Sequence, residues 1–200
     1  MVKEVVVATR NRHKVKEIRE ILKGLKVRVR SLEGFGKAPE VVEDKKTFEE
    51  NASKKSRIIS RFTHRLTIAD DSGLEVDALD GRPGVRSARF AGKEQDYLKN
   101  NLKLLRLLEK VPYSKRKARF VCVISIARGG RVLDVVRGTC SGRISRKMKG
   151  KTGFGYDPVF ISPYYGKTFA ELGPGIKNRI SHRYKALKKA RKAISRLLDI

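Results

Sequence analysis

Two adjacent carboxylates, Asp70 and Asp71, are the residues of this sequence whose types and position most clearly suggest chemistry. They follow the apolar run at 66–69 and precede Ser72 and Gly73. We therefore expect a short strand that ends at a sheet edge in a rigid, oxygen-rich turn. Hard cations such as Mg²⁺ prefer oxygen ligands and are often held by only one or two protein carboxylates. The pattern predicts a metal site to which other acidic residues would contribute, namely Glu40, Glu43 and Glu75. A solvated acidic turn, or Asp70 acting as a cap, is the structural alternative.

A second polar segment, residues 9–14, lies between an expected strand and the N-terminus of an expected helix. Free backbone N–H groups and the positive end of the helix dipole make such a junction suitable for phosphate. Thr9 and Asn11 add polar side chains, and Lys14 adds a positive charge on the first helical turn. Residues 177–183 place a similar set of donors at the start of the last helix. Ordinary capped and solvated helix ends are the structural alternative for both segments.

The glycine-rich segment at 150–158 is the third candidate for ligand binding. Glycines permit the close approach of a ligand to the backbone. Phe154 and Tyr156 offer aromatic faces on which a base could stack. The structural alternative is a bulged loop whose aromatic side chains pack in the core.

Hydrophobic periodicity predicts the elements that must position these residues. The first 31 residues predict a strand, a helix capped by Asn11 and a second strand. A capping box at 47–50 begins a second helix, and further helices are expected at 95–109 and 182–198. The core-facing stripes would be Phe48, Ala52, Ile59 and Phe62 in the second helix, and Leu98, Leu102, Leu105 and Leu108 in the third.

The middle of the sequence predicts antiparallel strands at 119–127 and 131–136, joined by a hairpin turn at Gly129-Gly130. Residues 138–144 would extend the same sheet, and 74–79 would form another short extended piece. Alternating strands and helices followed by a hairpin-rich middle indicate a mixed α/β fold, with a long central sheet flanked by helices.

Composition limits the classes of protein that remain. The 40% hydrophobic content is enough for a folded core in 200 residues, and no segment is apolar for long enough to span a membrane. The segment Met1–Val5 lacks a signal-peptide core, and Cys122 and Cys140 are too few for a disulfide framework. These features favour the cytoplasm. The net charge of +27 predicts anionic partners without naming them.

Five motifs in order make the sequence resemble the inosine triphosphate pyrophosphatase family, the Ham1-like pyrophosphatases of non-standard purine nucleotides. The resemblance runs nearly from end to end. Arg10 stands where the family has glycine, which either restricts close backbone approach to the triphosphate or adds a phosphate ligand. The motifs are Ala8-Thr9-Arg10-Asn11-Arg12-His13-Lys14, Asp70-Asp71-Ser72-Gly73-Leu74, Gly81-Arg82-Pro83-Gly84-Val85-Arg86-Ser87-Ala88-Arg89, Gly153-Phe154-Gly155-Tyr156-Asp157-Pro158, and Lys177 with Ile180-Ser181-His182-Arg183.

The resemblance implies roles for individual residues. Asp71 would be a metal ligand and the general base, and Asp70 and Glu40 would complete the metal site, with Glu43 as the alternative carboxylate. Ser72 would lie beside the substrate. The triphosphate would be held by Thr9, Asn11, Lys14 and Lys55, with Arg10, Arg12 and His13 in the same segment. The base and sugar pocket would be formed by Phe154, which stacks on the base, and by Gly155, Tyr156, Asp157, Lys177, His182 and Arg183.

The resemblance also implies Mg²⁺-dependent hydrolysis of ITP, dITP and XTP to the monophosphate and pyrophosphate. It implies that residues 1–200 form a single domain with two lobes, and that a substrate cleft between the lobes is lined near 9–14, 70–73, 153–157 and 177–183. A homodimer is expected, and a membrane partner is not. Two alternatives stay open. One is a nucleic-acid-binding protein, with non-specific contacts from the basic last helix. The other is a pyrophosphatase for modified pyrimidine nucleotides.

Overall fold

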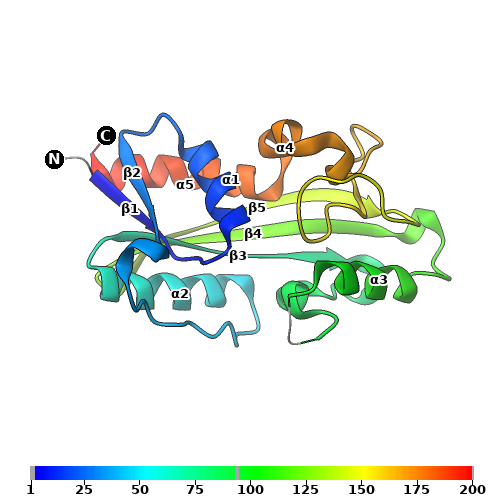
Figure 1. Cartoon of the computed structure of the whole chain (residues 1–200), viewed down its shortest axis with the longest axis horizontal. Helices are drawn as coiled ribbons and strands as arrows, with labels where there is room; N and C mark the ends of the chain where they lie inside the picture. The colour runs from blue at the N-terminus through cyan, green and yellow to red at the C-terminus, as the bar shows by residue number, and fades with distance from the viewer. Residues whose placement is uncertain (1–2, 93–94, 200) are drawn as a thin grey trace. The chain divides into compact units, whose positions relative to one another are not determined.

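The computed structural model describes residues 3–92 and 95–199 of the chain, so Met1 and Val2 of the predicted N-terminal segment lie outside the described residues. The chain divides into two compact units, each assembled from segments far apart in the sequence. Long strands carry the chain from one unit to the other (Figure 1). Unit 1 comprises residues 1–71, 122–138 and 183–200, and unit 2 comprises residues 72–121 and 139–182.

Six strands form one hydrogen-bonded sheet in the order β2-β1-β3-β4-β5-β6. β1 is parallel to both β2 and β3, whereas β5 and β6 are antiparallel. The predicted mixed α/β fold is therefore confirmed, including the parallel β-α-β unit in the first 31 residues. The strands are β1 (Lys3–Val7), β2 (Val27–Ser31), β3 (Leu66–Val76), β4 (Lys117–Arg128), β5 (Arg131–Ile144) and β6 (Phe160–Ile161).

Five α-helices accompany the sheet within the described residues: α1 (Arg12–Leu22), α2 (Phe48–Thr63), α3 (Tyr97–Leu107), α4 (Phe169–Ile180) and α5 (His182–Leu198). Short 3₁₀ turns lie at Leu32–Phe35, Asp77–Leu79, Gly84–Arg89 and Tyr113–Lys115. None of the described helices is long and apolar enough to cross a bilayer.

In unit 1 the sheet is covered on both faces, because alternate residues of a strand point to opposite sides. Val5 and Val7 of β1 pack in a cluster with α1 and α5. Val6 and Ala8 pack in a second cluster that includes Ile59 of α2. Figure 1 shows the same arrangement, with α1 and α5 on one side of the strands and α2 on the other.

β3 follows the same alternation up to its two carboxylates. Leu66 and Ile68 belong to the cluster with α1 and α5, and Ala69 belongs to the cluster with α2. By parity, Asp70 points towards α1 and α5, and Asp71 points towards α2. Adjacent residues in the sequence are thus directed to opposite faces of the sheet.

The prediction of an acidic turn at a sheet edge is wrong. β3 is one continuous strand of 11 residues that includes 70–73, and β1 and β4 are its neighbours in the sheet. β1 pairs with β3 only as far as Val7 opposite Ile68. The two carboxylates therefore lie just beyond the point where β1 ends. Asp, Ser and Gly have weak strand propensity, but the long-range pairing of β3 overrides it.

The helix expected at 95–109 is α3, and its predicted core stripe is confirmed for Leu105 and Leu108 but not for Leu98 and Leu102. Leu98 and Leu102 are more than half exposed, whereas Leu104, Asn100 and Asn101 are buried. Hydrogen bonds from the two asparagine side chains to backbone carbonyls explain this orientation, since they need a buried position. In α2, Phe62 is likewise 42% exposed rather than in the core.

α4 was missed by the sequence analysis, although Thr168 and Glu171 form a reciprocal capping box at its start. Gly173, Pro174 and Gly175 follow directly, and such residues usually indicate a loop. The structure accommodates them by a kink, because Gly173 has a φ of 73° inside the helical segment.

Other local predictions are confirmed. Asn11 caps α1 and Thr47 begins α2 with the predicted capping box. Gly129 and Gly130 both have positive φ, as a tight hairpin between β4 and β5 requires. Cys122 is a buried thiol, as predicted.

Candidate active site

The first candidate site lies at the end of β1, where the chain turns into α1. The Asn11 side chain accepts hydrogen bonds from the backbone N–H groups of His13 and Lys14, at 3.0 and 3.2 Å. The Thr9 hydroxyl accepts a further bond from the Asn11 N–H, at 3.2 Å. These bonds fix the first turn of α1, and Lys14 on that turn extends towards β3. The Lys14 ammonium lies 2.9 Å from the Asp70 carboxylate.

Asp70 belongs to a buried cluster of two carboxylates and two cations. Arg183, from the start of α5, pairs with Glu17 of α1 and lies 3.5 Å from Asp70. Lys14 completes the charge balance. Burial alone would raise the pKa of Asp70, but the positive charges of Lys14 and Arg183 outweigh it and hold the pKa well below its usual value. Asp70 is therefore ionised and serves to position cations.

Asp71 has a different environment on the other face of the strand. Burial, followed by the negative charge of Glu43, raises the pKa of Asp71 to about 6. The charges of Lys14 and Lys55 and a hydrogen bond with Asn51 oppose this shift without cancelling it. A carboxylate whose pKa lies near neutrality can accept or release a proton under physiological conditions.

Glu43 and Lys55 form an ion pair beside Asp71. Lys55 and Asn51 are both on the buried face of α2, one helical turn apart, so the helix aligns an ammonium and an amide towards β3. Sequence reasoning did not single out Asn51 or Glu17. Asn51 could have been found from the sequence, because it is a polar residue on the apolar face of an amphipathic helix.

The predicted metal trio of Glu40, Asp70 and Asp71 is not a preassembled cluster. Within residues 3–92 and 95–199, no three His, Cys, Asp or Glu side chains lie together as a metal site. Glu40 is exposed, and Asp70 faces its two cations. The carboxylate coupled to Asp71 is Glu43 instead. Strand alternation separates Asp70 from Asp71, and only the folded loop before α2 decides which glutamate approaches.

The remaining residues of the 9–14 segment lie at the surface. The Arg10 guanidinium donates a 2.8 Å hydrogen bond to the Ala38 carbonyl, which ties the turn to the loop before α2. Arg12 is exposed and pairs with Glu33, and His13 is exposed as well. Arg10, in the position of the expected glycine, therefore has a structural contact of its own.

In unit 2, Asp157 organises the glycine-rich loop. Its buried carboxylate accepts a hydrogen bond from the Phe154 N–H at 2.8 Å and pairs with the Lys177 ammonium at 2.7 Å. The same ammonium lies 4.5 Å above the centre of the Phe154 ring. A Cβ on Gly153, whose φ is +82°, would lie 2.1 Å from the Asp157 carboxylate. Glycine is required there.

The other residues of this unit divide between the core and the loop. Tyr156 is buried, and its hydroxyl donates to the Ser87 carbonyl at 2.9 Å, which favours the core interpretation of its ring. His182 is buried and stacks on Phe120, with ring centres 4.6 Å apart. The Asn101 side chain holds the Gly155 carbonyl at 2.8 Å. Ser72 is half-buried in β3.

The fold and these two sets of residues define a mixed α/β protein in which the first turn of α1, with Lys14, lies next to two buried carboxylates, one of them with a raised pKa. The chain belongs to the Ham1 family, whose model matches residues 5–193. It is 53% identical to a dITP/XTP pyrophosphatase of Desulforamulus reducens, over 97% of this chain and 96% of that protein. It is 52% identical to a dITP/XTP pyrophosphatase of Geobacillus kaustophilus, over 94% and 92% of the two chains. The solved structure of a HAM1 protein from Coxiella burnetii superposes with a TM-score of 0.88 at 38% identity, covering 97% of this chain and 99% of that one.

Proposed function

We propose that this protein hydrolyses ITP, dITP and XTP to the nucleoside monophosphate and pyrophosphate, in a reaction that depends on Mg²⁺. The observation that carries the proposal is the pair Asp71 and Glu43, with the pKa of Asp71 raised to about 6, next to the cations Lys14 and Lys55. The names of the relatives support the same activity.

The donor set beside Asp71 fits a hard dication. The negative charge of Glu43 helps to raise the pKa of Asp71, and a bound cation would relieve the repulsion between the two carboxylates. Their oxygens are of the kind that Mg²⁺ takes, and a site of one or two carboxylates leaves room for substrate phosphates. We assign Asp71 and Glu43 as the residues that would hold Mg²⁺. When bound, the ion supplies neutralisation of the phosphate charge.

The phosphates are held by the chain's own donors. Thr9, Asn11 and the first turn of α1 present hydroxyl, amide and backbone N–H groups, and Lys14 and Lys55 present ammonium groups. Arg10, Arg12 and His13 lie in the same segment and add positive charge around it. Binding the triphosphate here brings its α-phosphorus to the carboxylate side of β3.

Asp71 then acts on water. It accepts the proton as the water oxygen attacks the α-phosphorus. The bond from that phosphorus to the bridging oxygen breaks, and pyrophosphate leaves. The nucleoside monophosphate is the other product. Without the ion, the pKa of Asp71 is about 6, so its carboxylate is ionised in most molecules at neutral pH.

The base is recognised by the residues of the glycine-rich loop and of the motif at 177–183. Phe154 provides a stacking face, with Ser72 and Gly155 beside the substrate, and the buried Tyr156 supports the loop from the core. Donors on Lys177, His182 and Arg183 would read the 6-oxo group, and Asp157 orients Lys177. Adenine would leave such donors unpaired at a cost of about 1–3 kcal/mol each. The predicted substrate cleft between the two lobes stays part of this proposal.

Two further properties belong to the proposal. A homodimer is supported by α3, on which Leu98 and Leu102 lie one turn apart and are more than half exposed. Light scattering of the purified protein would test it. We also propose that the protein is cytoplasmic, because it would meet free nucleotides there. Cell fractionation would test this location.

The direct test is pyrophosphate release by the wild type and by Asp71→Asn, with a panel of ITP, XTP, ATP, GTP and modified pyrimidine triphosphates. We expect Mg²⁺-dependent release from ITP and XTP, and a nearly complete loss in a folded Asp71→Asn. Turnover close to that of the wild type in the variant would exclude Asp71 as the base. Preference for a modified pyrimidine would favour the second enzyme class instead.

A further inference from the structure

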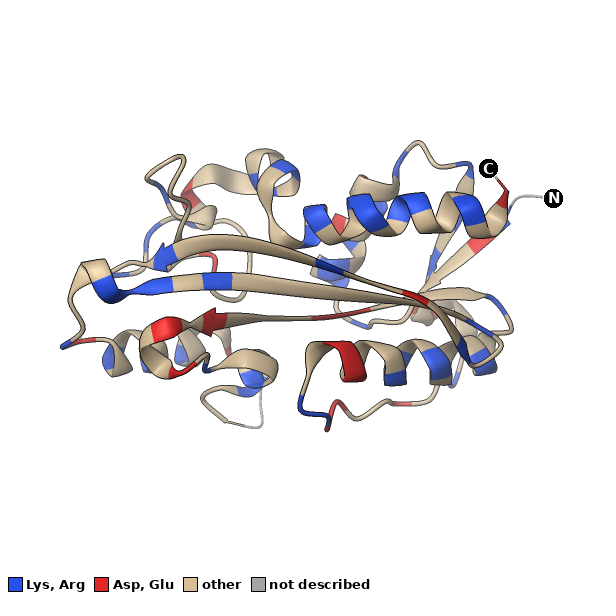
Figure 2. Ribbon diagram, turned by 180° about the vertical axis from the view of Figure 1, so that it is seen from behind, with Lys and Arg blue, Asp and Glu red and all other residues tan. Residues whose placement is uncertain are grey.

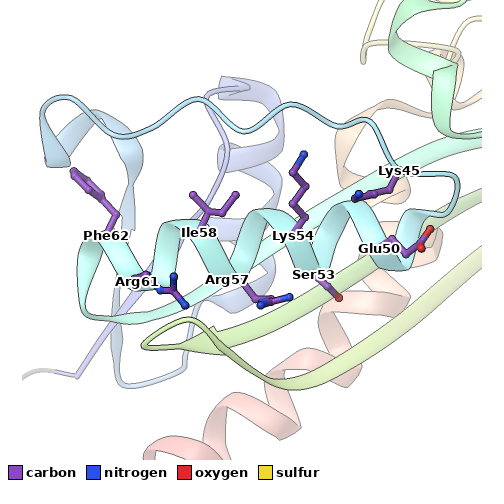
Figure 3. Close-up of a pocket in the computed structure, with 8 residues that line it drawn as sticks. All are labelled: Lys45, Glu50, Ser53, Lys54, Arg57, Ile58, Arg61 and Phe62. Atoms are coloured by element: carbon purple, nitrogen blue, oxygen red, sulfur yellow. The ribbon is translucent and has the colours of Figure 1, made fainter.

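The outward face of α2 carries a groove that the proposed reaction does not use. It is lined by Lys45, Glu50, Ser53, Lys54, Arg57, Ile58, Arg61 and Phe62 (Figure 3). The lining residues on the helix recur at intervals of three and four, so they form one continuous surface about 18 Å long. Asn51 and Lys55 belong to the opposite, buried face. One helix thus separates the candidate active site from this groove.

The groove has an excess of positive charge. Its four cations face one carboxylate, Glu50, and that carboxylate accepts the hydrogen bonds of the Thr47 capping box. Lys54 is paired with Asp44. Within the described part of the chain, no carboxylate forms an ion pair with Lys45, Arg57 or Arg61. These cations remain available to an anionic partner.

Two apolar side chains lie among these charges. Phe62 is 42% exposed and Ile58 is 36% exposed, and Figure 3 shows both on the same side of the helix as Lys54. Arg57 and Arg61 line the same groove and point to the other side of the helix in Figure 3. A groove with an exposed aromatic ring and arginines can bind a single strand, because an unstacked base packs on the ring while the arginines contact the phosphates.

The shape of the groove also restricts the partner. The loop before α2 borders one side, where Lys54 donates to the Val42 carbonyl, and the β4–β5 hairpin borders the other, where Gly130 donates to Ser60 (Figure 3). A bordered groove suits a single strand better than a flat membrane surface. Two apolar residues are few for an amphipathic helix, which needs a repeated row of anchors.

We propose that this groove binds single-stranded nucleic acid, with phosphates on Arg57 and Arg61 and a base on Phe62. The net charge of +27 would bring the strand to the protein, since it attracts polyanions from a distance. The groove would be the place where the attracted strand binds. The basic face of α5 is less suitable, because Lys189, Arg191 and Arg196 already contact Arg137, Lys23 and Asp134.

The test is fluorescence anisotropy with a labelled oligouridylate of about 20 nucleotides, over a series of salt concentrations. We expect Arg57→Ala/Arg61→Ala to weaken binding about ten-fold or more, and to reduce the slope of log K against log salt by about 1.4, since two phosphate contacts are lost. Phe62→Ala should weaken binding several-fold and leave the slope unchanged. Hydrolysis of ITP should stay at the wild-type rate in both variants.

Lys188→Ala/Lys192→Ala is the matched control, because it removes the same charge from α5. It should change binding by less than about two-fold. An equal loss of affinity in the two double variants would mean that the net positive charge alone causes binding, and it would overturn the proposal. It would also be overturned by absence of binding near physiological salt, by equal affinity for duplex DNA, or by preferred binding of anionic vesicles or an acidic peptide. Circular dichroism and thermal unfolding confirm that each variant is folded.

Discussion

At the residue scale, the structure separates two neighbouring aspartates into different chemical roles. Asp70 is balanced by two cations and stays ionised, whereas Asp71 is buried beside a second carboxylate and has a raised pKa. The cause is the alternation of β3, which turns one side chain towards α1 and α5 and the other towards α2. Environment rather than residue type decides which one is suited to act as a base.

The raised pKa of Asp71 predicts a dependence of stability on pH in the metal-free protein. The pKa rises from 3.8 to about 6 on folding, so the folded state binds the proton more tightly. Stability is therefore present at low pH and is lost as the pH rises from about 4 through about 6. Asp71→Asn cannot ionise, and above that range it should be more stable than the wild type by roughly 2–3 kcal/mol.

Urea unfolding in the presence of a chelator, near pH 8 and near pH 4, measures this difference. The free energies of unfolding of the wild type and Asp71→Asn should become equal at the lower pH. An Asp71→Asn variant that is less stable than the wild type at both pH values would contradict the assignment of a strained carboxylate.

Arg183 allows a second test at this scale. Its guanidinium pairs with Glu17 and Asp70, so Arg183→Ala would remove one of the two cations that balance these carboxylates. Arg183→Lys keeps the charge but loses the planar set of donors. We expect Arg183→Lys to lower kcat/KM for ITP and XTP by about ten- to a hundred-fold more than for ATP, if one buried donor reads the 6-oxo group. Equal losses on ITP and ATP would assign Arg183 to phosphate or sugar.

At the scale of elements, the glycine-rich loop has no regular secondary structure, and the buried ion pair of Asp157 with Lys177 organises it. Phe154, Asp157 and Lys177 form a connected group in which backbone, carboxylate, ammonium and ring contact one another. The loop can take this form because Gly153 has no side chain.

Gly153→Ala should therefore destabilise the protein more than an ordinary glycine replacement. Gly166→Ala is the matched control, since Gly166 also has a positive φ but its Cβ would meet nothing within 4 Å. Gly166→Ala should lower the free energy of unfolding by about 1 kcal/mol, because of backbone strain. Gly153→Ala should lower the free energy of unfolding by at least about twice that amount, because Asp157 must move. The same movement should raise KM for ITP. Thermal and urea unfolding with steady-state kinetics measure both effects; equal costs would show that the contact with Asp157 is not restrictive.

At the scale of the whole molecule, positive charge is the dominant feature. Figure 2 shows Lys and Arg along α2 and α5 and on the strands, with far fewer acidic residues. The exposed cations of α5 alternate with a core stripe of Leu187, Ala190 and Ile194. They thus lie on the solvent side of a helix whose other side packs against the sheet.

We expect reversal of two of these charges, in Lys188→Glu/Lys192→Glu, to leave kcat/KM for ITP within about two-fold of the wild type at physiological salt. Both side chains are exposed, and neither belongs to the clusters around Asp71 or Asp157. A large loss of turnover in a variant that still unfolds cooperatively would show that long-range charge attracts the substrate.

The sequence by itself determined those features whose causes are local. Asn11, Thr47 and Gly129-Gly130 act through hydrogen bonds and dihedral angles within a few residues, so the start of α1, the start of α2 and the β4–β5 hairpin were predictable. The order of strand and helix patterns along the chain likewise made the mixed α/β class predictable. The candidate residues came from motif order and from the chemistry of carboxylates beside cations, and their roles stay predictions.

Only the tertiary structure decided the rest, because it depends on contacts between distant segments. Pairing with neighbouring strands extends β3 through Asp70 and Asp71, where local propensity favours a turn. The path of the loop before α2 decides that Glu43 and not Glu40 couples to Asp71. Burial of Asn100 and Asn101 rotates α3 so that Leu98 and Leu102 face solvent. In each case the residues nearby in the sequence do not specify the arrangement, and contacts with distant segments do.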